Sequence, residues 1–149
     1  MKFYNSCLVF FTIFGQTQLV DLITDEVDIQ KKNDCVTVVL PFEIQDGFHI
    51  QDINDTKDNL IATKITFADE EDFEIAHFKI ASLNYDKVIL DQIEHRVLSN
   101  RLEVVVTIKT SIKHSKSILL KGKFYYQACN DRQCFFPRTL NFEVPIDAF

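Results

Sequence analysis

Two cysteines near the C-terminus are the residues whose type and spacing suggest chemistry. Cys129 and Cys134 are separated by four residues, which begin with the dipeptide Asn130-Asp131. Asn and Asp favour turns, so a hairpin-like loop is predicted to set one cysteine opposite the other. Directly opposed residues on antiparallel strands lie about 4.5–5.5 Å apart at Cα, a separation that a disulfide accepts. The spacing therefore predicts two thiols that can bond with little backbone movement.

The size of the closed loop bears on what such a bond does. Closing about six residues stabilises a fold by only about 2 kcal/mol, against about 4.7 kcal/mol for a hundred-residue loop. A bond from Cys35 to either of the two would join more distant segments and stabilise more. The local pair suits a couple that opens and closes, and small-loop structural disulfides fit the same spacing. Both interpretations stay open on spacing alone.

Charged neighbours and metal chemistry give further alternatives. Arg132 in the loop would favour a thiolate, and Asp131 beside it would oppose that effect. Zinc could be held by the pair together with Cys35 or a histidine, but no second paired ligand motif exists, so we expect no metal and no cofactor. The histidines are scattered singly, at His49, His77, His95 and His114. Hydrolase and nucleotide-binding glycine motifs are also missing from the sequence.

The segments that must position Cys129 and Cys134 are predicted to be β-strands. Four segments alternate apolar and polar residues with period two, at 36–44, 102–108, 118–126 and 140–146. Such alternation is typical of half-buried strands in antiparallel sheets. Shorter candidate strands lie at 48–50, 61–67 and 73–80, and a helical turn is the interpretation for 86–98. Gly122 lies within one strand, at a position where a large side chain has no room.

About seven strands with no repeat and no linker predict one all-β domain. An immunoglobulin-like antiparallel β-sandwich is the expected architecture, and a closed barrel is the alternative. The chain has only three glycines, so Asn and Asp are expected to make most turns.

Length and charge limit the classes of function. The chain has 149 residues, 16 Lys and Arg against 22 Asp and Glu, and a formal net charge of −6. No basic excess is present to neutralise phosphates, so nucleic acid is not an expected partner. The acidic balance also argues against binding to an anionic membrane surface.

The N-terminus has the pattern of a secretory signal. Lys2 supplies a positive charge, the following run is apolar, and Gly15 precedes polar residues. The apolar run is shorter than the roughly 20 residues that span a bilayer, so no stable membrane insertion is expected. A buried first strand is the alternative. Cleavage after Gly15 divides the chain into a signal peptide, a lead-in and one domain, at residues 1–15, 16–32 and 33–149.

The cysteine segment resembles a known active-site hairpin. The run from Gly122 to Asp131, followed by Cys134 and Pro137, is similar to that of the N-terminal periplasmic domain of the bacterial thiol:disulfide interchange protein DsbD. The segment Asp46-Gly47-Phe48-His49-Ile50 resembles the Gly-Trp-His-Ile strand entry of the same family. The similarity spans residues 33 to 146.

The resemblance implies an immunoglobulin-like fold and a protein-disulfide reductase or interchange activity in the periplasm. Cys134 would enter the mixed disulfide and Cys129 would resolve it, with Tyr126 and Gln127 positioning the pair. The family shields its cysteines with an aromatic cap loop, where this chain offers Leu90. Thioredoxin-like proteins are the implied partners, and a separate membrane electron carrier would supply electrons. A non-catalytic binding or accessory module with a structural disulfide is the competing function.

Overall fold

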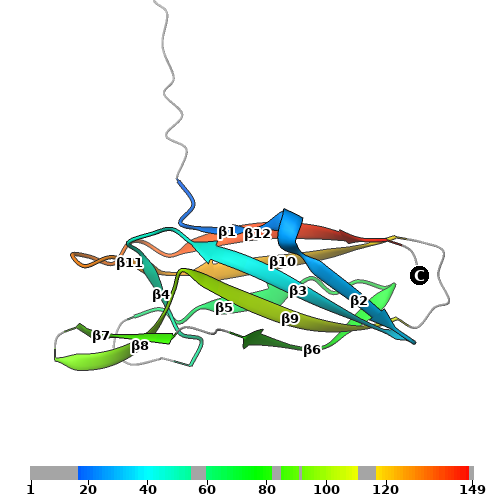
Figure 1. The fold of residues 1–149 in the computed structure, drawn as a ribbon, viewed down its shortest axis with the longest axis horizontal. Coiled ribbons are helices and arrows are strands. Elements are labelled where there is room, and N and C mark those ends of the chain that lie inside the picture. Colours follow the sequence, from blue (N-terminus) through cyan, green and yellow to red (C-terminus); the bar gives the residue numbers. More distant parts are fainter. Residues whose placement is uncertain (1–16, 55–59, 82–84, 91, 111–116, 148–149) are drawn as a thin grey trace, which may run out of the picture.

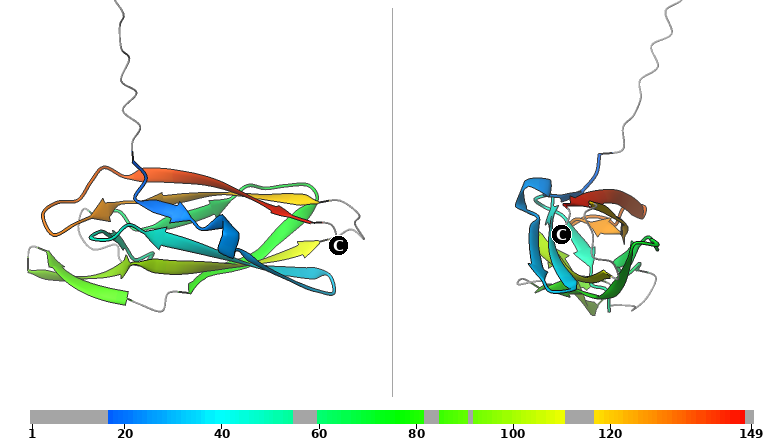
Figure 2. Two further views of the ribbon diagram at one scale, coloured as in Figure 1. Left: turned by 45° about the horizontal axis from the view of Figure 1, so that its top comes forward. Right: turned by 90° about the vertical axis from the view of Figure 1, so that its right-hand side faces the viewer.

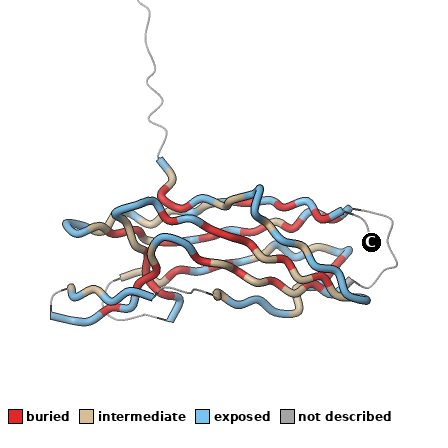
Figure 3. Tube along the Cα trace, in the orientation of Figure 1, coloured by how far each residue is buried: buried red, intermediate tan, exposed pale blue. Residues whose placement is uncertain are grey.

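Period-two alternation becomes β-strand at each of the four predicted positions. The long strands β3, β9, β10 and β12 span Cys35–Ile44, Arg101–Thr110, Ile118–Tyr126 and Arg138–Ile146. Buried and exposed residues alternate along them, so each strand turns one apolar face inward (Figure 3). The computed structural model describes residues 17–54, 60–81, 85–90, 92–110 and 117–147. The predicted signal peptide, residues 1–15, lies outside the described residues.

Two antiparallel sheets face each other across the core, as expected for an immunoglobulin-like sandwich (Figures 1 and 2). One has the order β1-β3-β9-β6 with β2 also paired to β3, and the other has the order β12-β10-β5. Their additional strands are β1 Val20–Leu22, β2 Asp28–Lys32, β5 Lys64–Phe67 and β6 Phe73–Ala81. The Phe42 ring of β3 lies 4.7 Å from that of Phe124 on β10 and 5.5 Å from that of Phe142 on β12. These aromatic contacts join the two sheets.

A third sheet carries the cysteine hairpin. Its order is β11-β4-β8-β7, and its strands span Ala128–Cys129, His49–Gln51, Ile93–Ser99 and Tyr85–Leu90. The helical turn predicted at 86–98 is wrong, because β7 and β8 form an antiparallel hairpin there. His95 and Val97 are buried and lie two residues apart, which is the periodicity of a strand. Exposed residues around them make that periodicity hard to detect in the sequence.

The expected count of about seven strands is also too low, because the described residues contain twelve. The missed strands are short or mostly exposed. Both β1 and β2 lie in the predicted lead-in, residues 16–32, yet they pair with β3. Since β2 is an exposed edge strand, it shows no apolar alternation that a sequence pattern would detect.

Asparagine does serve at tight turns, as the low glycine content predicted. Asn33 between β2 and β3 has a φ of 54°, and Asn100 between β8 and β9 has a φ of 62°. Asn adopts this left-handed conformation more readily than most residues. Gly47 has a φ of 82° and opens the connection from β3 to β4. After that turn, β4 runs alongside β11 of the cysteine hairpin.

Gly122 on β10 is required by a ring on the neighbouring strand. It lies directly opposite Phe142 of β12. A Cβ added at Gly122 would lie 2.3 Å from Cζ of Phe142. The Phe142 ring is itself bounded by Phe42 and by Phe67, whose centroid lies 6.0 Å away. The sequence expectation that no large side chain fits here is confirmed.

Candidate disulfide site

The cysteine pair closes a tight loop at one end of the sandwich (Figure 1). Cys129 and Cys134 are joined by a disulfide and pair as an antiparallel bridge, with their Cα atoms 3.9 Å apart. The N–H of Asn130 donates to the carbonyl of Gln133 at 3.0 Å, and the N–H of Phe135 donates to that of Ala128 at 2.8 Å. These bonds close the hairpin on either side of the disulfide, as the spacing predicted.

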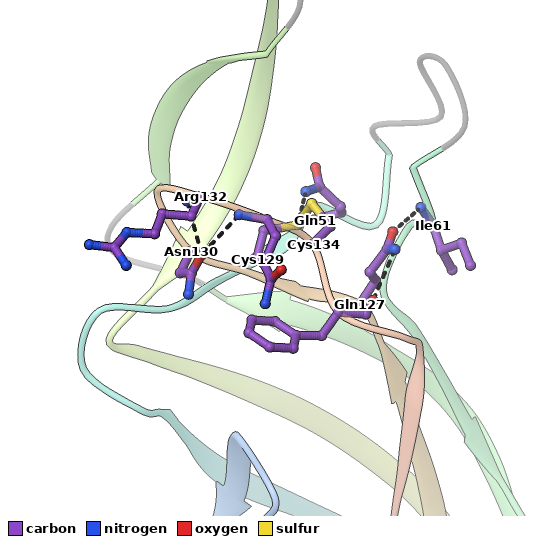
Figure 4. The surroundings of a disulfide bond; sticks show 9 residues. Gln51, Ile61, Gln127, Cys129, Asn130, Arg132 and Cys134 are labelled. Carbon is purple, nitrogen blue, oxygen red and sulfur yellow. Dashed lines mark hydrogen bonds between the residues drawn. A yellow bond between two sulfur atoms is a disulfide. The ribbon is translucent and has the colours of Figure 1, made fainter.

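The side chain of Asn130 forms the turn. Its Oδ1 accepts hydrogen bonds from the N–H groups of Arg132 at 2.9 Å and Gln133 at 3.0 Å (Figure 4). A side-chain oxygen that accepts from the backbone two and three residues onward stabilises a turn without any glycine. The hairpin therefore holds its shape through Asn130 as well as through the disulfide.

Gln127, predicted to support the pair, ties the hairpin together. Its Nε2 donates to the carbonyl of Phe135 at 3.1 Å, and its Oε1 accepts from the N–H of Ile61 at 3.0 Å (Figure 4). One amide thus bridges the two sides of the hairpin and joins them to the segment that leads into β5. Gln127 positions the backbone around the cysteines.

Tyr126, also predicted to support the pair, is directed elsewhere. Its ring is fully buried and lies 5.9 Å from the Phe124 ring. Its hydroxyl accepts from the N–H of Leu19 at 3.1 Å and donates to Oε1 of Gln18 at 2.8 Å. Tyr126 therefore anchors the start of β1 to β10.

Arg132 and Leu90 are not brought to the sulfurs. Arg132 is exposed, and its guanidinium extends away from the disulfide in Figure 4. Leu90 of β7 pairs with Ile93, at the start of β8. Ser99, six residues further along β8, pairs with His49, and His49 lies opposite Cys129. Six residues of strand span about 20 Å. The predicted cap position thus lies at the far end of the β7–β8 hairpin.

Two polar residues of β4 lie beneath the pair instead. Cys129 is directly opposite His49, and the fully buried Gln51 directs its Nε2 to Sγ of Cys129 at 3.7 Å. Sequence patterns missed Gln51 because only the register between β4 and β11 places it there. The available signal was strand periodicity, since His49 and Gln51 are two residues apart and share a face.

The surroundings of His49 affect its ionisation. Burial lowers the pKa of the His49 imidazole, and the negative charges of Asp131 and Asp86 partly oppose that shift. A histidine whose pKa is lower in the folded than in the unfolded state binds protons more readily when unfolded. Its contribution to stability is therefore complete above the ordinary value of 6.5 and is lost as the pH falls toward the folded pKa.

We expect His49→Gln to reduce the acid sensitivity of the fold. The urea midpoint of the parent protein should fall as the pH drops below about 6.5, and that of the variant should fall less. His77→Gln, at an exposed position on β6, is the matched control and should follow the parent. Equal acid sensitivity in all three proteins would contradict the assignment to His49.

Aromatic residues flank the disulfide unequally. The Phe135 ring is half-buried and lies 5.7 Å from Phe48, whereas Phe136 is 92% exposed. Cys129 is 1% exposed and Cys134 is half-buried. The pair thus has one enclosed cysteine, Cys129, and one partly exposed cysteine, Cys134, which stands two residues before the exposed Phe136 in the sequence.

Cys35 lies far from this site. It begins β3, next to the β2–β3 turn, at the opposite end of the sandwich from β11 (Figure 1). Within the described ranges, no group of three or more His, Cys, Asp or Glu side chains is arranged to hold a metal. His114, one of the sequence candidates for zinc, lies outside those ranges. No helix in the described part of the chain is long and apolar enough to cross a membrane.

The fold and the bonded pair define an immunoglobulin-like sandwich with a disulfide hairpin at one end. No protein-family model and no curated protein matches the sequence. The N-terminal periplasmic domain of ScsB from Proteus mirabilis is similar in structure, with a TM-score of 0.53 and 11% identity. The match covers 81% of this chain and 44% of that one. At this identity the likeness shows a shared fold alone.

Two other solved domains align less well. The DsbD N-terminal domain of Neisseria meningitidis, in its reduced form, has a TM-score of 0.45 at 14% identity, over 82% of this chain and 85% of that one. The yeast GGA1 GAE domain has a TM-score of 0.48 at 11% identity, over 89% and 96%. Neither TM-score supports an argument about function.

Proposed function

We propose that this chain is a periplasmic thiol:disulfide interchange protein that passes electrons between thioredoxin-like partners. The observation that carries the proposal is the unequal exposure of the bonded pair, with Cys129 enclosed and Cys134 accessible. Thiol–disulfide exchange begins when a thiolate reaches one sulfur of a disulfide, so access decides which sulfur is attacked. Cys134 is then the exchanging residue and Cys129 the resolving one.

The reaction follows from this assignment. A partner thiolate attacks Sγ of Cys134, the Cys129–Cys134 bond breaks, and Cys129 leaves as a thiolate with the electron pair of that bond. The second thiolate of the partner then attacks the mixed disulfide and releases Cys134. The partner dithiol is oxidised to a disulfide, and the chain gains two electrons and, once both thiolates are protonated, two protons. The reverse sequence reduces a client disulfide.

The proposed setting is the periplasm, reached after cleavage of residues 1–15. An oxidising compartment permits a cysteine pair to persist as a disulfide or to cycle. In this proposal the chain receives its electrons from a membrane electron carrier. Arg132 and Leu90 keep no assigned part in the chemistry, whereas Gln127 positions the hairpin.

A binding or accessory module with a structural disulfide is the second candidate. The small loop and the additional bonds of Asn130 favour it, because they would hold the hairpin in either redox state. Replacing both Cys129 and Cys134 by Ser separates the functions. An interchange protein loses all exchange with thioredoxin-like dithiols, whereas a binding module retains its partner.

We expect Phe136→Ser to slow exchange about tenfold, because exposed aromatic residues near the centre of an interface contribute much of its binding energy. Phe136 is 92% exposed and lies two residues after Cys134. Ile89→Ser is the control, since Ile89 is 74% exposed on β7, near the Leu90 end of that strand. Stopped-flow exchange with a thioredoxin-like dithiol measures both variants. Equal rates for Phe136→Ser and the parent would exclude Phe136 from the docking surface.

A further inference from the structure

Gln51 is a buried amide in contact with one reacting atom. Its side chain reaches Cys129 from β4, and Nε2 donates to Sγ at 3.7 Å (Figure 4). Gln51 is 0% exposed, so water does not compete for the amide. The Oγ1 of Thr63 donates to the Gln51 carbonyl at 2.5 Å, and Val97 of β8 pairs with the same residue. Neighbours on both sides therefore fix its backbone.

Packing alone does not account for an amide at this position. Among the described residues, none forms a hydrogen bond with Oε1 of Gln51, although that atom is buried. A buried polar atom without a partner destabilises the fold. Leucine or methionine would fill a similar volume without that cost. The amide therefore has a role that depends on its contact with the sulfur.

The contact would strengthen when the disulfide opens. A disulfide sulfur is a weak acceptor, whereas a thiolate carries a full charge, and hydrogen bonds to charged acceptors are about twice as strong as neutral ones. An interaction that is stronger after bond breaking than before lowers the free energy of the product relative to the reactant. No formal charge is needed, and the guanidinium of Arg132 points away from the sulfurs (Figure 4).

We propose that Gln51 stabilises the thiolate of Cys129 that leaves when a partner attacks Cys134. This inference rests on the proposed interchange function and names the residue that makes Cys129 the better leaving group. The partner dithiol supplies both electrons. The Cys129–Cys134 bond breaks, its electron pair stays on Sγ of Cys129, and the N–H of Gln51 donates to that sulfur.

The test titrates Cys129 alone in the full chain, with Cys7, Cys35 and Cys134 replaced by Ser. Ultraviolet absorbance of the thiolate is followed against pH. Gln51→Leu should raise the pKa of Cys129 and lower its thiolate fraction at neutral pH by about tenfold. Gln45→Leu changes an exposed residue at the start of the connection from β3 to β4, and it should leave the titration of Cys129 unchanged. Gln51→Met gives the same readout if the leucine variant fails to fold.

An unchanged titration in both folded Gln51 variants would overturn the inference. A lower pKa for Cys129 would also overturn it, because the amide oxygen rather than the N–H would then face the sulfur. The titration needs no redox partner, so its result is independent of whether the protein exchanges with thioredoxin-like proteins. A raised pKa together with no exchange would retain the thiolate contact and reject the interchange function.

Discussion

Cys129→Ser should accumulate a mixed disulfide between Cys134 and a thioredoxin-like partner that is supplied in its disulfide form, because the Cys134 thiolate attacks that disulfide and one partner cysteine leaves as a thiolate. Without the enclosed cysteine, the bond formed at the accessible sulfur has no resolving thiol within the chain. With Cys7 and Cys35 also replaced by Ser, any covalent complex must involve Cys134. Non-reducing electrophoresis and mass spectrometry of the linked peptides measure the complex.

Cys134→Ser in the same background is the matched control. Its remaining thiol belongs to Cys129, which is 1% exposed, so about tenfold less complex should form. Equal trapping by the two variants would contradict the assignment of Cys134 as the exchanging residue. Trapping by neither variant would favour the accessory-module alternative.

Gly122→Ala should lower the free energy of unfolding by about 2 kcal/mol, because added volume in a packed core forces rings off their positions. The new Cβ would lie 2.3 Å from Cζ of Phe142. Phe42 and Phe67, whose rings lie 5.5 and 6.0 Å away, limit the directions in which the Phe142 ring can move. Urea unfolding followed by circular dichroism measures the loss.

A double-mutant cycle tests the cause of that loss. Phe142→Leu removes the ring and should itself destabilise the core through lost packing. If the clash is responsible, adding Gly122→Ala to Phe142→Leu should cost much less than adding it to the parent. Strictly additive losses would show that the ring and the glycine do not interact.

The sandwich was predictable because its long strands carry their own signal. Alternation along 36–44 and 118–126 identifies strands whatever their partners, because one face of each must be buried. The β7–β8 hairpin gives a weaker signal, because its buried residues, such as His95, stand among exposed ones. Edge strands such as β2 bury too little to leave any pattern.

The candidate site was predictable only where it is local. The turn between Cys129 and Cys134 could be predicted from their spacing and from Asn130, because all three residues lie within six consecutive positions of the sequence. Gln51 lies 78 residues from Cys129, and their contact depends on the register of β4 against β11. No local pattern specifies such a register, so the polar contact beneath the disulfide emerged only in three dimensions.

Tyr126 shows the limit of transferring a motif position. The resemblance gives it a part in positioning the cysteines, and it stands directly before Gln127 in the sequence. Strand alternation sends the two side chains to opposite faces, so Tyr126 enters the core and bonds Gln18 and Leu19. Its hydroxyl secures β1, a strand that sequence patterns did not detect.

The reduction potential of the Cys129–Cys134 couple tests the central claim most directly. Equilibration of the full chain with glutathione or thioredoxin buffers, followed by alkylation and mass spectrometry, measures it. An interchange protein should have a potential within about −270 to −120 mV, the range of thioredoxin-like couples. A value below about −300 mV, typical of inert structural disulfides, would contradict the proposed function.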